Sequence, residues 1–362
     1  AMIKNRNRIF LGIVVGLFFL LCAMVWFKPD TEYSRVERRK LNKVPEISME
    51  RILSGKFMTE FETYSLDQFP FRQAFRSLRA QTSLKRDNQG LYVVDGSIVS
   101  MEYPLKEESL VYTSKKFRNV YEMYLKDSGS NVYLSIVPDK NYFFAKDNGY
   151  LSLDYEEMVS TLVEDNSYMT YIDIFPLLSE EDYYKTDTHW KQENLTEVAD
   201  RLLFSMGNGG EYTYEVVKAP GDFYGVYYGQ AALPLEPDEI SYLTNSTIES
   251  YKVYDYENNQ EIPVYDLTQM EQDDPYELFL GGPISLVTIE NQMATNEEEL
   301  IIFRDSFGSS IAPLLAEGYK KVTLIDIRYI QPGVLKNYVD FKGKDVLFLY
   351  STMVLNNSET IK

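Results

Sequence analysis

The sequence predicts an α/β domain built on a mainly parallel β-sheet. Short, mainly apolar runs of strand length alternate along the chain with longer segments in which apolar residues recur at helical spacing. Strands with few polar positions are typical of a sheet that helices cover on both faces. The strand candidates are Asn131–Val137, Thr170–Ile174, Leu300–Phe303, Val322–Ile327 and Val346–Tyr350.

Two helical patterns separate these strands. Aromatic and apolar residues at positions 117, 120, 121 and 124 mark one helix face, and a second apolar stripe runs from Leu195 to Met206. Gly207 follows this stripe and is the predicted C-cap. Residues 211–296 break the alternation with Tyr-rich, β-like pieces and turn signals, so we interpret them as a β-rich insertion.

An uncharged apolar stretch occupies residues 9–27. At about 1.5 Å per residue it is long enough to cross the hydrocarbon core of a bilayer as a helix. Lys4, Arg6 and Arg8 precede it, and the positive-inside rule then places residues 1–8 in the cytoplasm and the rest of the chain outside. A cleaved signal peptide is the competing interpretation, but the run is longer than a typical h-region and no clear A-x-A site follows. We expect a single-pass anchor in the cell membrane.

The remaining organisation follows from composition. Residues 28–48 are charged and unpatterned, which is typical of a juxtamembrane linker. Residues 49–362 are expected to form the extracytoplasmic domain. Its first part, around residues 60–84, has partly helical spacing that Pro70 interrupts, and predicts a helical entry segment.

Composition excludes several classes of function. The formal net charge of −19 argues against nucleic acid, because phosphate backbones are bound through excess Lys and Arg. The only cysteine, Cys22, excludes an intramolecular disulfide. The single histidine excludes multi-histidine zinc sites, and the acidic residues show no ligand spacing, so neither a metal nor another cofactor is expected. Thirty tyrosines favour surfaces that stack on polar partners such as sugars.

The single histidine lies in the run Thr186-Asp187-Thr188-His189-Trp190. A general base for a serine needs an imidazole with one nitrogen towards the hydroxyl and the other donating to a carboxylate. Asp187, two residues upstream at a bend, can supply that carboxylate, and Trp190 could form a wall of the site. The alternative is a helix N-cap Asp with an incidental surface histidine.

A candidate nucleophile lies in the run from Arg304 to Ser310, between an apolar strand and a helical segment. A strand-turn-helix connection presents Ser306 at the carboxyl edge of the sheet, where helix N-terminal N–H groups can stabilise an oxyanion. The alternative is an ordinary turn in which a serine caps the helix. Taken together, the two runs predict a Ser306, His189 and Asp187 triad. Asp305 could replace Asp187 as the acid, although its side chain should point away from Ser306.

Four sequence runs resemble the DHHW protein family: T-D-T-H-W, R-D-S-F-G-S-S, Phe69-Pro70-Phe71-Arg72 and L-F-L-Y-S-T-M-V-L-N-N-S. The resemblance covers nearly the whole extracytoplasmic part of the chain. That family is similar to the SGNH-hydrolase-like proteins that include the alginate O-acetylation proteins. The resemblance implies a three-layer, flavodoxin-like SGNH fold in which Asp187 orients, His189 acts as base and Ser306 as nucleophile. The chain departs from the family motif at Thr188, where a first histidine is expected.

The resemblance also implies an activity. It implies transfer of an acetyl group through an acetyl-Ser306 intermediate to a hydroxyl of an exported or cell-wall polysaccharide. The expected partner is a multi-pass membrane-bound O-acyltransferase that supplies the acyl group. A carbohydrate acetylesterase with the same triad and a non-catalytic envelope protein that binds a glycan or a membrane partner are the alternatives. Further candidate substrate or oxyanion contacts are Lys140, Asn356 and Asn357, with solvent-facing loop positions as the alternative. Trp190 is another candidate, and so is Arg328, which lies in a family-like context and has a purely architectural role as its alternative.

Overall fold

A computed structural model gives the structure of the chain. It describes residues 11–13, 15–17, 19–20, 23–24, 28–69, 71–74, 76–77 and 90–362. The chain divides into two compact units. The larger comprises Gln89–Tyr227 and Leu235–Lys362, and the smaller comprises Ala1–Asn88 and Tyr228–Pro234.

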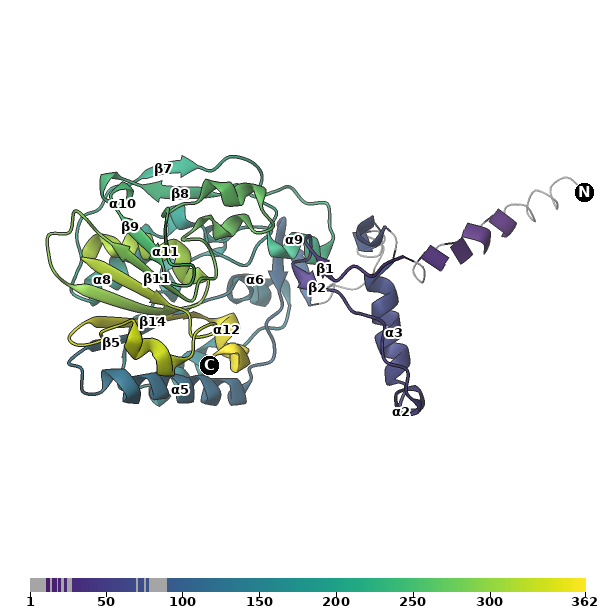
Figure 1. The fold of residues 1–362 in the computed structure, drawn as a ribbon, viewed down its shortest axis with the longest axis horizontal. Helices are drawn as coiled ribbons and strands as arrows, with labels where there is room; N and C mark the ends of the chain where they lie inside the picture. Colours follow the sequence, from purple (N-terminus) through teal and green to yellow (C-terminus); the bar gives the residue numbers. More distant parts are fainter. Residues whose placement is uncertain are drawn as a thin grey trace, which may run out of the picture. The chain divides into compact units, whose positions relative to one another are not determined.

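The larger unit is built on an eight-stranded sheet with the strand order β10-β9-β11-β13-β12-β14-β5-β6 (Figure 1). The strands from β13 to β6 run parallel to their neighbours, and β11, β9 and β10 continue the sheet in antiparallel pairing. The predicted α/β class with a mainly parallel sheet is therefore confirmed. The strands are β5 (Asn131–Val137), β6 (Thr170–Tyr171), β9 (Lys252–Asp255), β10 (Gln260–Ile262), β11 (Leu286–Glu290), β12 (Glu299–Arg304), β13 (Lys321–Ile325) and β14 (Asp345–Ser351).

The apolar runs are continuous because both faces of the sheet are buried. In β12, Leu300 and Ile302 contribute to one core, while Ile301 and Phe303 contribute to the other. Helices α8 (Thr196–Ser205) and α11 (Phe307–Leu315) pack into the first core. Helices α5 (Glu107–Val120), α7 (Tyr155–Asp165) and α12 (Thr352–Asn356) pack into the second. The carboxyl ends of β12 and β14 are thereby held between two helical layers.

The segment predicted as a β-rich insertion, residues 211–296, has two structural roles. It contains a separate antiparallel pair, β7 (Glu215–Lys218) and β8 (Ser241–Thr244). It also supplies β9, β10 and β11 to the central sheet, because β11 pairs with β13. This part of the segment extends the main sheet and is not an appended module. Other elements of the larger unit are the hairpin β3 (Leu91–Val94) and β4 (Ser97–Ser100), α6 (Lys140–Asn148) and α10 (Ser246–Glu249).

The smaller unit contains strands β1 (Tyr33–Ser34) and β2 (Arg39–Lys40) and helices α2 (Met49–Leu53) and α3 (Lys56–Asp67). Helix α9 (Val226–Ala231) begins in the larger unit and ends in the smaller one. The Arg39 guanidinium and the Asn42 side chain both donate to the Asp67 carboxylate. Part of residues 28–48, which composition predicts as a linker, is therefore folded against α3. The division between the two units falls near residue 88.

The predicted membrane span, residues 9–27, is described only in part, since residues 9, 10, 14, 18, 21, 22 and 25–27 lie outside the described residues. In the part of the chain that the structure describes, every helix is too short or too polar to cross a membrane.

Candidate active site

Ser306 lies between β12 and α11 and occupies the N-cap position of the helix. The neighbouring Asp305 shapes this turn, because its carboxylate accepts the backbone N–H of Phe307 at 3.0 Å and that of Ser351 at 2.7 Å. Asp305 is fully buried, whereas Ser306 is partly exposed. The Asp305 carboxylate thus binds the first turn of α11 to the end of β14 and presents the Ser306 hydroxyl at the carboxyl edge of the sheet.

His189 lies on a loop, residues 183–190, which we call the histidine loop and which a short antiparallel bridge closes. Tyr183 pairs with Trp190, and the Tyr184 N–H donates to the His189 carbonyl at 3.1 Å. Within the loop, Asp187 Oδ1 lies 2.6 Å from His189 Nδ1 and also accepts the His189 backbone N–H at 3.1 Å. Two contacts to one oxygen explain how a carboxylate only two residues upstream can orient the imidazole ring.

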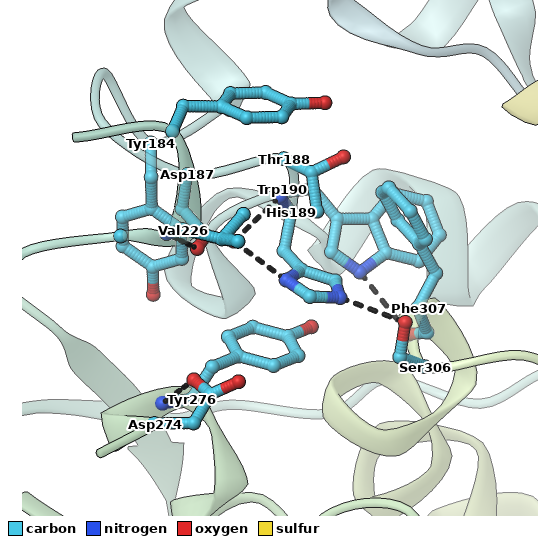
Figure 2. Close-up of polar contacts among 12 residues, drawn as sticks. Tyr184, Asp187, Thr188, His189, Trp190, Val226, Asp274, Tyr276, Ser306 and Phe307 are labelled. Atoms are coloured by element: carbon cyan, nitrogen blue, oxygen red, sulfur yellow. Dashed lines mark hydrogen bonds and ion pairs between the residues drawn. The ribbon is translucent and has the colours of Figure 1, made fainter. Parts of the chain in front are cut away.

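The second ring nitrogen faces the serine. His189 Nε2 lies 2.8 Å from Ser306 Oγ, and Figure 2 shows the imidazole edge directed at the serine hydroxyl. The structure therefore brings together the three residues predicted as a triad, although 117 positions separate His189 and Ser306. Asp187 is fully buried and His189 nearly so, at 8% exposure. With Nδ1–H donating to Asp187, Nε2 is the nitrogen left to accept the serine proton.

Asp238 binds the backbone of the histidine loop. Its carboxylate accepts the backbone N–H groups of Lys185 and Thr186, at 2.8 and 2.7 Å, and the Thr186 hydroxyl at 2.6 Å. The Thr186 hydroxyl in turn accepts the Gly225 N–H at 2.9 Å. We did not predict Asp238 from sequence, because its position in the chain carries no local signal that links it to the loop.

Lys140, a predicted substrate or oxyanion contact, binds the backbone of the loop. Its ammonium donates to the carbonyls of Tyr184, Lys185 and Asp187 at 2.8, 3.1 and 2.9 Å. The side chain is buried, and burial lowers the pKa of Lys140 to about 7, while the nearby Asp187 charge acts in the opposite direction. The three N–H donors of the ammonium match the three carbonyls, so Lys140 acts on the backbone of the loop.

Trp190 is buried behind the histidine instead of lining a substrate surface. Its Nε1 donates to Ser310 Oγ at 2.8 Å and to the Phe307 carbonyl at 3.2 Å. Tyr276, from the 3₁₀ turn Pro275–Leu278, stacks on the His189 imidazole with ring centroids 3.8 Å apart and an interplanar angle of 7° (Figure 2). Burial raises the pKa of Tyr276 far above its ordinary value. We did not predict Tyr276, because no local pattern distinguishes it from the other tyrosines.

Asn356 and Asn357, two further predicted contacts, bond to neighbouring backbone groups. Asn356 Oδ1 accepts the Lys106 N–H at 2.8 Å and its amide donates to the Pro104 carbonyl at 3.1 Å, so the side chain fastens the segment before α5. The Asn357 amide donates to the Met353 carbonyl at 2.9 Å within its own helical turn. Both side chains make these contacts within the fold, and their predicted binding of substrate or an oxyanion stays a prediction.

Arg328 is paired with an acidic neighbour. Its Nε and NH2 groups donate to the two carboxylate oxygens of Asp326 at 2.9 and 2.6 Å. The buried Arg304 guanidinium lies 3.6 Å from the same Asp326 carboxylate. Asp326 directly follows β13, so the Arg328–Asp326 ion pair lies at the carboxyl end of that strand. The geometry gives Arg328 an architectural contact, which is the alternative to a substrate contact that the sequence left open.

Thr188, where the sequence departs from the DHHW motif, lies on the same loop. Its hydroxyl donates to the Met353 sulfur at 3.1 Å, and it is partly exposed. Within the described residues, no group of three or more His, Cys, Asp or Glu side chains is placed to hold a metal ion.

Solved structures of known proteins share this fold. A DHHW family protein from Eubacterium siraeum matches with a TM-score of 0.60 and 20% identity, over 76% of this chain and 95% of that one. Bacillus cereus PatB1 with a sulfonyl adduct matches with a TM-score of 0.59 and 17% identity, over 73% and 97%. The O-acetyltransferase domain of Pseudomonas putida AlgJ matches more weakly, with a TM-score of 0.44 and 13% identity, over 74% of this chain and 92% of that one.

The predicted resemblance to DHHW proteins is therefore confirmed as a likeness of fold. No protein-family model and no curated protein matches the sequence.

Proposed function

We propose that the chain is an O-acetyltransferase that carries an acetyl group on Ser306 and delivers it to a hydroxyl of an exported or cell-wall polysaccharide. One observation supports this most directly: His189 Nε2 lies 2.8 Å from Ser306 Oγ while Nδ1 lies 2.6 Å from the Asp187 carboxylate. This is the arrangement that activates a serine for acyl transfer.

In the first half-reaction, Ser306 Oγ attacks the carbonyl carbon of an acetyl ester while His189 Nε2 takes the hydroxyl proton. Asp187 stabilises the imidazolium that forms. The negative charge on the former carbonyl oxygen develops close to the N-terminus of α11, where the positive end of the helix dipole stabilises an anion. The C–O bond of the donor then breaks, and His189 returns the proton to the departing alcohol.

The second half-reaction repeats these steps with the acceptor. His189 Nε2 takes the proton of the acceptor hydroxyl, whose oxygen attacks the acetyl-Ser306 carbonyl. The ester bond to Ser306 Oγ breaks, and the serine recovers its proton from His189. The same residues thus serve both directions of proton transfer, and the acceptor decides whether the product is an acetylated sugar or acetate.

We further propose that residues 9–27 anchor the chain in the cell membrane, with the larger unit outside the cytoplasm. The proposed donor is a multi-pass membrane-bound O-acyltransferase that brings acyl groups across the bilayer. An anchor in the same membrane raises the effective concentration of each partner for the other, so tight binding in solution is unnecessary. The uncharged run and the basic residues before it support this orientation.

The test uses the full-length chain in detergent with 4-nitrophenyl acetate as donor. Brief incubation should place an acetyl group on Ser306, detected by mass spectrometry of the peptide. Phenylmethylsulfonyl fluoride, a reagent of the sulfonyl class, should label the same residue. Ser306→Ala should abolish both, with turnover reduced by about 10³-fold or more. Ser309→Ala, a neighbouring buried serine, is the matched control and should behave as the wild type.

The acceptor is tested in the same assay by adding oligosaccharides from envelope polysaccharides. Acetylated oligosaccharide formed at the expense of free acetate supports the transferase. Acetate as the sole product, whatever sugar is added, would instead identify an acetylesterase. A folded chain whose Ser306 reacts with neither reagent would contradict catalysis and favour a binding role.

A further inference from the structure

Ser310 lies in the second turn of α11, and its buried hydroxyl joins two groups that flank the histidine. It accepts the Trp190 Nε1–H at 2.8 Å and the Tyr276 hydroxyl at 2.8 Å, and its own proton is directed to the Phe307 carbonyl at 3.3 Å. A serine hydroxyl has one donor and two acceptor positions, and all three are used here. Ser310 therefore has a defined orientation.

These contacts join the histidine loop to helix α11, which follows Ser306. Trp190 directly follows His189, so its bond to Ser310 ties the backbone of the base to the helix that begins after Ser306. Gln192 adds a second tie, since its amide donates to the Ser310 carbonyl at 2.5 Å. Two side chains of one short segment are thus bonded to the same residue of α11.

Tyr276 contacts the His189 imidazole ring directly. Its side chain lies parallel to the His189 imidazole at 3.8 Å, and its hydroxyl is held by Ser310. The two ring nitrogens are directed to Asp187 and Ser306. The ring could still turn about the line that joins these two contacts, and the Tyr276 ring on one face of the imidazole limits that rotation. An aromatic face also attracts a cation, and an imidazolium forms when His189 accepts the serine proton.

We infer that Ser310 and Tyr276 are positioning residues that set the plane of the His189 imidazole relative to the Ser306 hydroxyl. This inference rests on the proposed function, in which His189 is the base. Tyr276 acts by stacking, and Ser310 acts through Tyr276 and Trp190. Because the imidazolium exists only during reaction, loss of the stack lowers kcat more than it raises KM.

The kinetic test is a double-mutant cycle in the full-length chain with 4-nitrophenyl acetate. Ser310→Ala and Tyr276→Phe each remove the same hydrogen bond, and each should lower kcat about 10-fold with KM changed less than about twofold. The double variant should be no worse than the more affected single variant. The matched control is Ser309→Ala, which removes a buried hydroxyl that has no hydrogen-bond partner among the described residues. The inference would be overturned if the kcat losses of the two single variants multiplied in the double variant, or if Ser310→Ala and Ser309→Ala had the same kcat.

A spectroscopic test does not depend on turnover. The chain has a single histidine, so imidazole NMR resonances belong to His189 alone. The Tyr276 ring current should shield the His189 ring protons. Tyr276→Leu should move them downfield, Ser310→Ala should move them part of the way, and Ser309→Ala should leave them in place. Unchanged resonances in Tyr276→Leu would overturn the inference. Absence of Ser306-dependent turnover in the wild type, with the shifts as expected, would instead contradict the proposed function.

Discussion

The backbone N–H of Val226 donates to Asp187 Oδ2 at 2.8 Å, while the other carboxylate oxygen of Asp187 binds His189. The carboxylate is therefore held from two sides, by its own loop and by a segment 39 residues downstream. This relationship explains how a buried Asp keeps one orientation, and it makes the loop sensitive to changes around residue 226.

Asp187→Asn should abolish most of the proposed activity while the chain stays folded. An amide retains the shape of the side chain but does not stabilise the imidazolium, and it can favour the wrong imidazole tautomer. We expect kcat with 4-nitrophenyl acetate to fall by about 10³- to 10⁴-fold. Near-UV circular dichroism checks the fold. A variant with more than about a tenth of wild-type kcat would show that Asp187 does not have the proposed role.

Gly225→Ala should displace the same loop. A Cβ at this position would lie 2.4 Å from both the Asp187 Cβ and the Thr186 carbonyl oxygen, so one of these segments must move. We expect a loss of about 1–3 kcal/mol in unfolding free energy, measured by urea denaturation, and a fall in kcat. Gly333→Ala is the matched control, because nothing lies within 4 Å of a Cβ there. Equal behaviour of the two variants would contradict the steric account.

Lys140→Met should reveal a stability difference that depends on pH. Burial lowers the folded-state pKa of Lys140 to about 7, below the ordinary 10.5 of an unfolded chain. Between pH 7 and 10.5 the unfolded state binds more protons, so the contribution of Lys140 to stability rises with pH in that window. The wild type should gain about 2 kcal/mol relative to Lys140→Met between pH 7 and pH 9, measured by urea denaturation. A constant difference would show that the amine titrates normally.

Glu102→Gln should show the opposite pH dependence. Burial, and then the nearby Asp139 charge, raise the pKa of Glu102 to about 7 from its ordinary 4.5. Between pH 4.5 and 7 the folded state binds more protons, so the contribution of Glu102 to stability falls as pH rises. The wild type should lose about 2 kcal/mol relative to Glu102→Gln between pH 5 and pH 8. Urea denaturation measures the difference, and Glu156→Gln, at an exposed position of α7, is the matched charge-removing control.

Asn356→Ala should lower stability without lowering the intrinsic reactivity of Ser306. The Asn356 side chain is buried and satisfies backbone groups of Lys106 and Pro104. Its removal leaves an N–H and a carbonyl without these partners, at a cost of about 1–3 kcal/mol in unfolding free energy. Labelling by phenylmethylsulfonyl fluoride should proceed at the wild-type rate at a temperature where the variant is folded. Slow labelling of a fully folded variant would instead support the predicted contact of Asn356 with substrate or an oxyanion.

Local patterns predicted much of the larger unit. β5 occupies the predicted residues Asn131–Val137, and the apolar stripe from Leu195 to Met206 matches α8, which ends before Gly207 with its positive φ of 84°. Such features depend on the alternation of apolar and polar side chains and on glycine in a left-handed conformation, which neighbouring residues specify. The same holds for the strand-turn-helix at Ser306, because an apolar strand followed by small polar residues defines that connection.

The sequence by itself thus determined the α/β class, the main strands and the three side chains proposed for the chemistry. Tertiary structure decided the partners of the other candidate residues: Tyr276 stacks on the imidazole, Asp238 and Lys140 bind the backbone of the histidine loop, and Asn356 bonds to Lys106 and Pro104. It also placed β11 beside β13, so that a predicted insertion became part of the central sheet. The physical reason is that these contacts join segments far apart in the chain. Their partners are selected by packing and hydrogen bonding of the whole fold, which no local spacing encodes.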